Sequence, residues 1–134
     1  MNIGQAARFS GVSAKMIRYY ESTGLLQPAP RTTSGYRVYS DHDIQALVFI
    51  RRARDLGFSL DRIGTLLELW HNRKRRSADV KQLAQRHLRE LDEDIARLVS
   101  IRNELQRLAD GCHGDDTPDC PILEDLAQCL THHT

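Results

Sequence analysis

The stretch that decides the fold is NIGQAARFSGVSAKMIRYYE, residues 2–21. Its apolar residues recur at helical spacing over residues 2–9, which predicts a short helix there. A tight turn at residues 10–12 follows, and Ser13 has the short hydroxyl side chain that favours the N-cap of a second helix over residues 14–21. Two short helices joined by a three- or four-residue turn containing glycine are typical of a helix-turn-helix unit.

The segment that follows this unit, residues 27–40, disfavours a helix. It contains two prolines and a Thr-Thr-Ser-Gly run, and the Ser34-Gly35 pair favours a turn. We expect a short extended piece on each side of that turn, with Arg31 and Arg37 flanking it. The sequence therefore predicts a small β-wing beside the helix-turn-helix unit.

A second pair of helices is indicated farther along the chain. Ser40 with Asp43 three residues later has the pattern of a capping box, which opens a helix to about Leu56. Gly57 is placed to end that helix, and Ser59 is placed to cap the next one. The organisation of the first pair is thus repeated.

A long helical pattern of about 33 residues begins with Ser77 as its cap and ends near Gly111, after a basic connector at residues 73–76. At about 1.5 Å per residue this helix would be roughly 50 Å long, too long for the interior of so small a protein. Its apolar stripe has heptad-like spacing, interrupted at Arg102, and consists of Leu88, Leu91, Ile95, Leu98, Leu105 and Ala109. We expect this stripe to pack against the same helix of a second copy, in a coiled-coil dimer.

Composition and charge narrow the class of protein. No apolar run approaches the roughly 20 residues of a transmembrane helix, and the first residues lack the basic-then-apolar profile of a signal peptide. We therefore expect a cytoplasmic protein without membrane contact.

The net charge of +1 conceals an asymmetry: residues 1–78 hold 13 Lys and Arg against 6 Asp and Glu, whereas residues 79–134 hold 6 against 12. A basic front half favours nucleic acid as a partner, and no nucleotide-binding glycine loop or nucleophile motif points to an enzyme.

The stretch CHGDDTPDC, residues 112–120, is the strongest sign of a small ligand. Two cysteines bound a polar loop, and thiolates favour Cu(I), zinc and iron–sulfur clusters over hard cations. Two thiolates are too few for an ordinary four-coordinate structural zinc site. The residues alone leave three interpretations open: a low-coordinate soft ion, a further ligand from elsewhere in the protein, or a disulfide.

The order of the motifs over residues 1–77 resembles the DNA-binding half of the MerR family of transcription regulators. The matching text comprises IGQAA (3–7), GVS (11–13), IRYYE (17–21), GLL (24–26), Arg31, GYRVY (35–39) and FIRRARDLGFS (49–59). The remainder, to about residue 127, resembles the metal-sensing branch of that family. Within that branch it is most similar to the copper-efflux regulators and their gold-responsive relatives.

This resemblance implies an all-α fold with a small β-wing, in three parts. They are a winged helix-turn-helix DNA-binding domain that includes the second helical pair (1–76), a long antiparallel coiled-coil dimerisation helix (77–110), and a metal-binding loop with a short helix and tail (111–134). The helix over residues 14–21 would lie in the major groove as a recognition helix. The side chains expected to face DNA are Lys15, Arg18, Tyr19, Tyr20, Arg31, Tyr36, Arg37 and Arg54.

The resemblance also implies that Cys112 and Cys120 hold a metal ion as thiolates, which leaves a net charge of −1 around a monovalent ion. In the family, the residue that matches Ser77 approaches the loop from the other subunit, and sensors of divalent zinc, mercury or lead place a cysteine there. A serine at this position argues for Cu(I), with Ag(I) or Au(I) as alternatives. Ser77 would also bring the positive end of the long helix near the anionic site, although a plain helix cap explains the residue equally well.

Other soft-metal ligands near the end of the chain are weaker candidates. His113 is expected to be a solvent-facing loop residue, and Cys129, His132 and His133 form a candidate second cluster close to a chain end, where order is usually low.

As a whole, the resemblance implies a homodimeric, copper(I)-responsive activator that binds a dyad operator and works with RNA polymerase at the promoter. It would activate metal-efflux or detoxification genes by metal-dependent DNA distortion. The alternative functions are a gold- or silver-selective sensor of the same family and a thiol–disulfide redox regulator.

Overall fold

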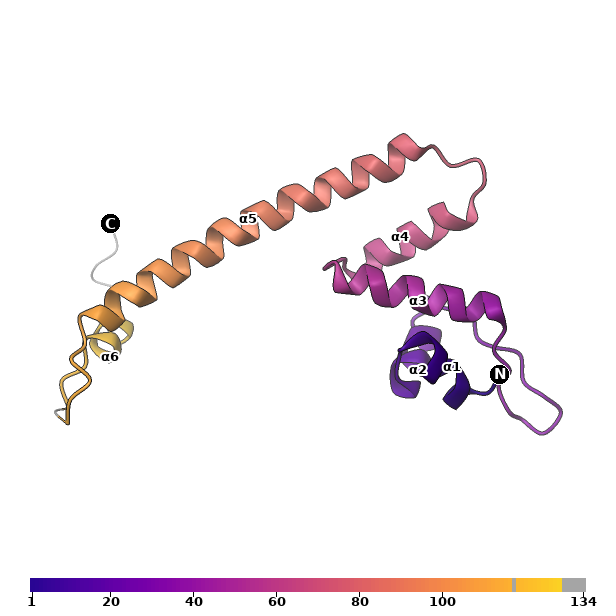
Figure 1. The fold of residues 1–134 in the computed structure, drawn as a ribbon, viewed down its shortest axis with the longest axis horizontal. Helices are drawn as coiled ribbons and strands as arrows, with labels where there is room; N and C mark the ends of the chain where they lie inside the picture. The colour runs from indigo at the N-terminus through magenta and orange to yellow at the C-terminus, as the bar shows by residue number, and fades with distance from the viewer. Residues whose placement is uncertain (117, 129–134) are drawn as a thin grey trace. The chain divides into compact units, whose positions relative to one another are not determined.

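The computed structural model describes residues 1–116 and 118–128, and these residues are mostly helical, as the sequence predicts (Figure 1). The helices are α1 (Ile3–Ser10), α2 (Ala14–Ser22), α3 (Asp41–Asp55), α4 (Leu60–His71), α5 (Ser77–Asp110) and α6 (Pro121–Leu126). No helix in the described ranges is long and apolar enough to cross a membrane. The chain divides into two compact units, Met1–Leu83 and Ala84–Thr134.

The ends of α1 and α2 are fixed by the side chains that the sequence offers. Asn2 and Gln5 form a capping box at the start of α1, and Ser13 Oγ accepts a hydrogen bond from the backbone N–H of Met16 at the start of α2. Gly11 ends α1 with a φ of 76°, a left-handed conformation that disfavours residues with a Cβ. A Cβ at Gly11 would also come within 3.3 Å of Arg51 Nε. The backbone conformation therefore favours glycine at the turn, whereas the flexible Arg51 side chain could move to admit a Cβ.

The segment between α2 and α3 contains one β-bridge, which is antiparallel and joins Arg31 to Arg37. The backbone N–H of Thr32 donates to Tyr36 O at 2.7 Å, and the N–H of Gly35 donates to Thr32 O at 2.9 Å, so the chain reverses tightly. The segment returns to the body of the unit at Tyr39, whose N–H donates to Met1 O at 2.7 Å. We refer to residues 31–37 as the wing segment.

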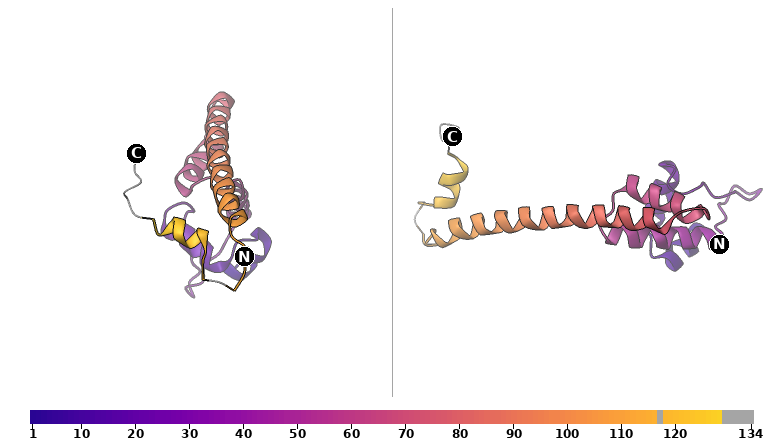
Figure 2. Two further views of the ribbon diagram at one scale, coloured as in Figure 1. Left: turned by 90° about the vertical axis from the view of Figure 1, so that its left-hand side faces the viewer. Right: turned by 90° about the horizontal axis from the view of Figure 1, so that it is seen from above.

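Helix α3 is the centre of the N-terminal unit, and α1 and α4 pack against it (Figures 1 and 2). The capping box predicted at Ser40 and Asp43 is present at its start, and Ser59 caps α4 as predicted. The buried apolar residues of this unit form one core: Ala6, Val12, Ile17, Tyr20, Leu26, Ala29, Tyr39, Ala46, Leu47, Ile50, Ala53, Ile63 and Leu67. This core is shared by all four helices, so it fixes the position of α2 and of the chain that leads to and from the wing segment.

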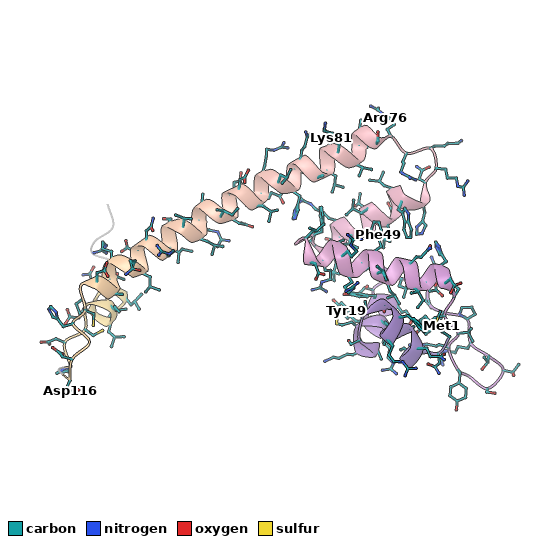
Figure 3. All side chains as sticks on the ribbon, viewed as in Figure 1. Met1, Tyr19, Phe49, Arg76, Lys81 and Asp116 are labelled. Carbon is teal, nitrogen blue, oxygen red and sulfur yellow. The ribbon has the colours of Figure 1, made fainter. Side chains whose placement is uncertain are left out.

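Helix α5 is a single helix of 34 residues (Figure 2), and Ser77 is its first residue rather than the capping residue before it. The expectation that Ser77 is the N-cap is therefore wrong by one position, because Asp79 N–H already donates to the carbonyl of Arg76. Side chains project from α5 along its whole length (Figure 3). Four members of the apolar stripe are more than half exposed in the single chain: Leu88, Ile95, Leu98 and Leu105.

Candidate nucleic-acid interface and thiol loop

Helix α2 presents three of the side chains that the sequence assigns to DNA. Lys15, Arg18 and Tyr19 are exposed on it. They are held there because the opposite face of the helix is buried through Ile17 and Tyr20. The exposed face of α2 therefore combines two cationic side chains with an aromatic ring on a rigid element.

Tyr20 is placed differently, since its side chain belongs to the core and only 3% of the residue is exposed. Its hydroxyl oxygen accepts a hydrogen bond from Arg54 Nη1 at 3.2 Å. Arg54 comes from the last turn of α3 and is itself exposed. Tyr20 thus orients an arginine that the sequence also assigns to DNA, and its ring is covered by the protein.

A hollow of about 320 Å³ brings α2 and the wing segment together. It is lined by Asn2, Ile3, Arg18, Arg31, Gly35, Tyr36 and Arg37. Four of these seven residues are predicted DNA contacts, although they come from two separate stretches of sequence. The structure thus gathers three guanidinium groups and an exposed tyrosine around one concave surface, a chemistry suited to phosphate oxygens.

A buried carboxylate lies behind this surface. Glu21, at 8% exposure, accepts a hydrogen bond from the Tyr39 hydroxyl group, and its Oε1 lies 3.7 Å from Arg37 Nη1. Its Oε2 atom is buried and has no hydrogen-bond partner among the described residues. Glu21 therefore ties two residues of the returning chain to α2, the helix that carries Arg18.

Burial of the Tyr39 phenol, reinforced by its hydrogen bond to the negative Glu21 carboxylate, raises the pKa of Tyr39 from 10.0 to about 12. Sequence reasoning identified neither Glu21 nor Tyr39 as a functional residue. A glutamate at the end of an amphipathic helix is usually solvated, and its burial becomes visible only when the chain after the wing segment folds over it.

Cys112 and Cys120, which define the second candidate site, lie at the two ends of the connection between α5 and α6. Both are partly buried and both are free thiols. Cys112 lies in the turn after α5, where its N–H donates to Ala109 O at 3.1 Å, and Cys120 precedes the first residue of α6 and accepts from Glu124 N–H at 3.0 Å. The two thiols are thus anchored by separate helices, with a polar loop that contains Asp116 between them (Figure 3).

Two thiols of this kind suit a soft ion, because thiolate sulfur is the ligand type that Cu(I) favours. Within the described residues, no group of three or more His, Cys, Asp or Glu side chains is gathered to hold a metal ion. His113 is exposed, as expected for a loop residue. Cys129, His132 and His133 lie outside the described residues.

Comparison with known proteins gives a consistent result. A family model described as MerR HTH family regulatory protein matches residues 1–70, and one described as MerR, DNA binding matches residues 44–108. Heavy metal-dependent transcription regulator 2 of Rhizobium meliloti is 56% identical, over 95% of this chain and 86% of its own length. The regulator CueR of Escherichia coli is 42% identical, over 98% of both chains. The crystal structure of PbrR691 from Ralstonia metallidurans in complex with lead(II) superimposes with a TM-score of 0.82 at 31% identity, covering 95% of this chain and 99% of that one.

Proposed function

Since the chain belongs to the MerR family of helix-turn-helix regulatory proteins, we propose that it is a cytoplasmic, copper(I)-responsive activator that binds a promoter operator as a homodimer. The two relatives described above carry names of transcription regulators, and the name of the Rhizobium meliloti protein states that it is heavy metal-dependent. The choice of ion rests on the set of donor atoms: a partly buried thiol lies at each end of the loop, and a serine is the first residue of α5. Ag(I) and Au(I) remain alternatives, because they share the preference of Cu(I) for few, soft ligands.

In the proposed DNA complex, α2 lies in the major groove and the wing segment contacts the flanking backbone. Lys15 and Arg18 reach base edges or phosphates, while Arg31, Tyr36 and Arg37 act from the wing segment. This division is supported by the hollow that Arg18 shares with the wing segment. Phosphate contacts would set the register of the protein on the duplex, and base contacts would select the operator.

Two sets of internal contacts hold the side chains of this surface in the orientation proposed for DNA binding. Tyr20 orients Arg54 through its hydroxyl group, and Glu21 holds Arg37 and Tyr39 close to α2. A guanidinium that is already oriented loses less side-chain entropy when it binds a phosphate. These residues therefore serve DNA binding as positioning residues.

The proposed homodimer forms through α5. Its exposed apolar stripe, with Leu88, Ile95, Leu98 and Leu105, has the spacing of a coiled-coil seam. Burial of large aliphatic side chains contributes about 1.5–3 kcal/mol each, so pairing of two such stripes would supply a strong driving force. The antiparallel sense follows from the family resemblance, and a two-fold dimer matches a dyad operator.

Metal binding would make the loop between Cys112 and Cys120 an anionic site. Cu(I) supplies a soft, monovalent centre there that two thiolates can satisfy. In the proposed dimer, the N–H groups in the first turn of the other subunit's α5, which begins at Ser77, would stabilise the remaining negative charge. A serine at that position adds no thiolate, and this favours a monovalent over a divalent ion.

The response would then be a two-state change of the dimer on DNA. Both states bind the operator, and metal favours the state in which the promoter is bent and untwisted, so that its two recognition elements align for RNA polymerase. Metal and DNA distortion are coupled because the metal binds one dimer geometry better than the other. The target genes would be those for metal efflux or detoxification.

The test is transcription in vitro from a promoter with an overlong spacer, using Cu(I), Ag(I), Au(I), Zn(II) and Hg(II) under reducing conditions. Activation by monovalent ions alone is expected, and the relative sensitivity then ranks copper, silver and gold. Activation by zinc or mercury would overturn the argument from Ser77. A response that survives copper chelation and is reversed by reductant would instead favour the thiol–disulfide alternative.

A further inference from the structure

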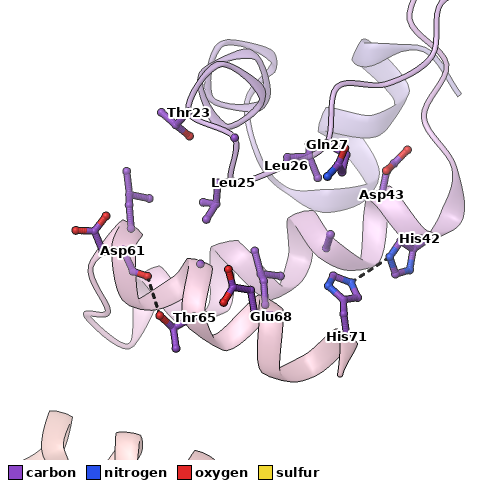
Figure 4. Close-up of a pocket in the computed structure, with 15 residues that line it drawn as sticks. Thr23, Leu25, Leu26, Gln27, His42, Asp43, Asp61, Thr65, Glu68 and His71 are labelled. Atoms are coloured by element: carbon purple, nitrogen blue, oxygen red, sulfur yellow. Dashed lines mark hydrogen bonds between the residues drawn. The ribbon is translucent and has the colours of Figure 1, made fainter. Parts of the chain in front are cut away.

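A second cavity of the N-terminal unit contains two histidines that neither DNA binding nor the thiol loop uses. The cavity has a volume of about 490 Å³ and lies between residues 23–27 and the helices α3 and α4. His42 is near the start of α3 and His71 is the last residue of α4. Figure 4 shows the two rings pointing toward each other across one end of this cavity.

The distance between the two rings is that of two ligands on one metal ion. His42 Nε2 and His71 Nε2 are 3.2 Å apart. Two imidazole nitrogens bound at 2.0–2.1 Å to a tetrahedral ion are about 3.3 Å apart. Without metal, a single hydrogen satisfies the pair, with one ring donating to the other. An ion could replace that hydrogen with little movement of either ring.

Aromatic neighbours hold the two rings in this arrangement. The His42 ring stacks on Trp70 with centroids 5.9 Å apart and planes at 18°, and Trp70 stacks on Phe49 at 4.9 Å and 12°. The His71 ring lies 5.1 Å from that of His42. Both histidines are exposed, so an ion can reach them from solvent. The pair is therefore preorganised and accessible, which reduces the entropy lost when a metal binds.

We propose that His42 and His71 bind a divalent first-row ion of the Zn(II) or Ni(II) class and clamp the start of α3 to the end of α4. Imidazole nitrogen is a ligand that suits zinc, nickel and copper. Glu68, three residues before His71 on α4, lines the same cavity (Figure 4). No third His, Cys, Asp or Glu joins the pair within the described residues, so water completes the coordination. This site differs from the thiol loop in ligand type and in the charge of its ion.

The clamp would act on the connection that follows α4. His71 is the last residue before residues 72–76, which lead into α5. Arg75 Nη1 in this connector already donates to the Trp70 carbonyl at 3.1 Å. An ion on His71 would therefore fix the end of α4 at the point where the connector is attached.

The test uses the only tryptophan of the chain, Trp70, as a reporter next to the site. Ni(II) is paramagnetic and quenches indole fluorescence at short range, whereas Zn(II) does not. Titration of the full-length protein with Ni(II) should give saturable quenching at one ion per chain, and added Zn(II) should reverse it. His42→Ala and His71→Ala should each abolish saturable quenching, whereas His113→Ala, the matched control, should keep it.

The same titration with a Cys112→Ser/Cys120→Ser variant separates this site from the thiol loop, and unchanged quenching is expected. Quenching that disappears with the cysteines, or that persists in both His42→Ala and His71→Ala, would overturn the proposal. Circular dichroism and operator binding of the histidine variants check that they fold, and His42→Gln and His71→Gln serve as conservative replacements if an alanine variant does not. Neither outcome alters the test of copper response, which reads transcription and depends on sulfur ligands.

Discussion

Replacement of Tyr39 with phenylalanine should change how the stability of the protein depends on pH. The Tyr39 phenol is 1% exposed and donates to the buried Glu21 carboxylate, and its pKa of about 12 lies above the ordinary tyrosine pKa of 10.0. Because the folded state keeps the proton longer than the unfolded state, the stabilisation is complete below pH 10 and is lost as the pH rises through 12. The difference corresponds to about 3 kcal/mol in full, of which about 1.4 kcal/mol is lost by pH 11.

The assay is urea unfolding of the wild-type protein and of Tyr39→Phe at pH 8 and at pH 11. At pH 8 the variant should be less stable by about 1.5–3 kcal/mol, since it lacks a hydrogen bond to a charged group. At pH 11 this gap should narrow by about 1.4 kcal/mol. The unfolded wild-type chain releases the Tyr39 proton at this pH whereas the folded protein mostly retains it, and this lowers the stability of the wild type only. Comparing the two proteins at each pH cancels the titration of the other tyrosines and of the lysines. Gaps of equal size at the two pH values would refute the assigned pKa, and tyrosinate absorbance should show one of the four tyrosines titrating last.

Three further outcomes test the DNA surface and the thiol loop. Arg18→Ala should weaken operator binding by about 1–3 kcal/mol with no change in bound metal per chain; a gel-shift titration like that of the wild type would contradict the role of Arg18. Cys112→Ser and Cys120→Ser should each abolish metal-dependent transcription and keep operator binding, because the thiols lie outside the DNA-binding unit; loss of both activities would indicate a structural role. Ser77→Cys should gain a response to Zn(II) in a transcription reporter, since it adds a third thiolate, and a reporter that stays silent would remove the argument from Ser77.

The helices could be predicted from the sequence because their ends are determined by local chemistry. Ser13, Ser40 and Ser59 each accept a hydrogen bond from the backbone N–H of the third residue of the helix that they are expected to cap. The start of α5 differs from the expectation by one residue: Ser77 is the first residue of the helix, and the N–H of Asp79 donates to Arg76 O. Boundaries of this kind depend on backbone conformation, which side-chain preference alone determines only to within a residue or two.

The sequence names the side chains that we propose for the DNA surface, but it does not show which of them are exposed and which are buried. A run of tyrosines at the end of α2 gives no sign that Tyr19 is exposed and that Tyr20 lies in the core and orients Arg54. That distinction depends on where α3 packs, which is a long-range property. The His42–His71 pair cannot be recognised in the sequence for the same reason: the two histidines are 29 positions apart, and the contact between α3 and α4 brings their Nε2 atoms to 3.2 Å.

The charge asymmetry of the chain has a physical meaning that only the structure reveals. In the sequence, each arginine of the basic half counts equally toward attraction of a polyanion. In the fold, Arg37 lies beside the buried Glu21, so part of its charge is already compensated. That carboxylate reduces the long-range attraction for DNA, yet it holds Arg37 of the wing segment close to α2 and so would reduce the entropy lost in the proposed contact of the hollow with the DNA backbone. Net charge therefore describes how strongly this half attracts DNA, whereas the position of its one buried carboxylate describes how well the surface is prepared for it.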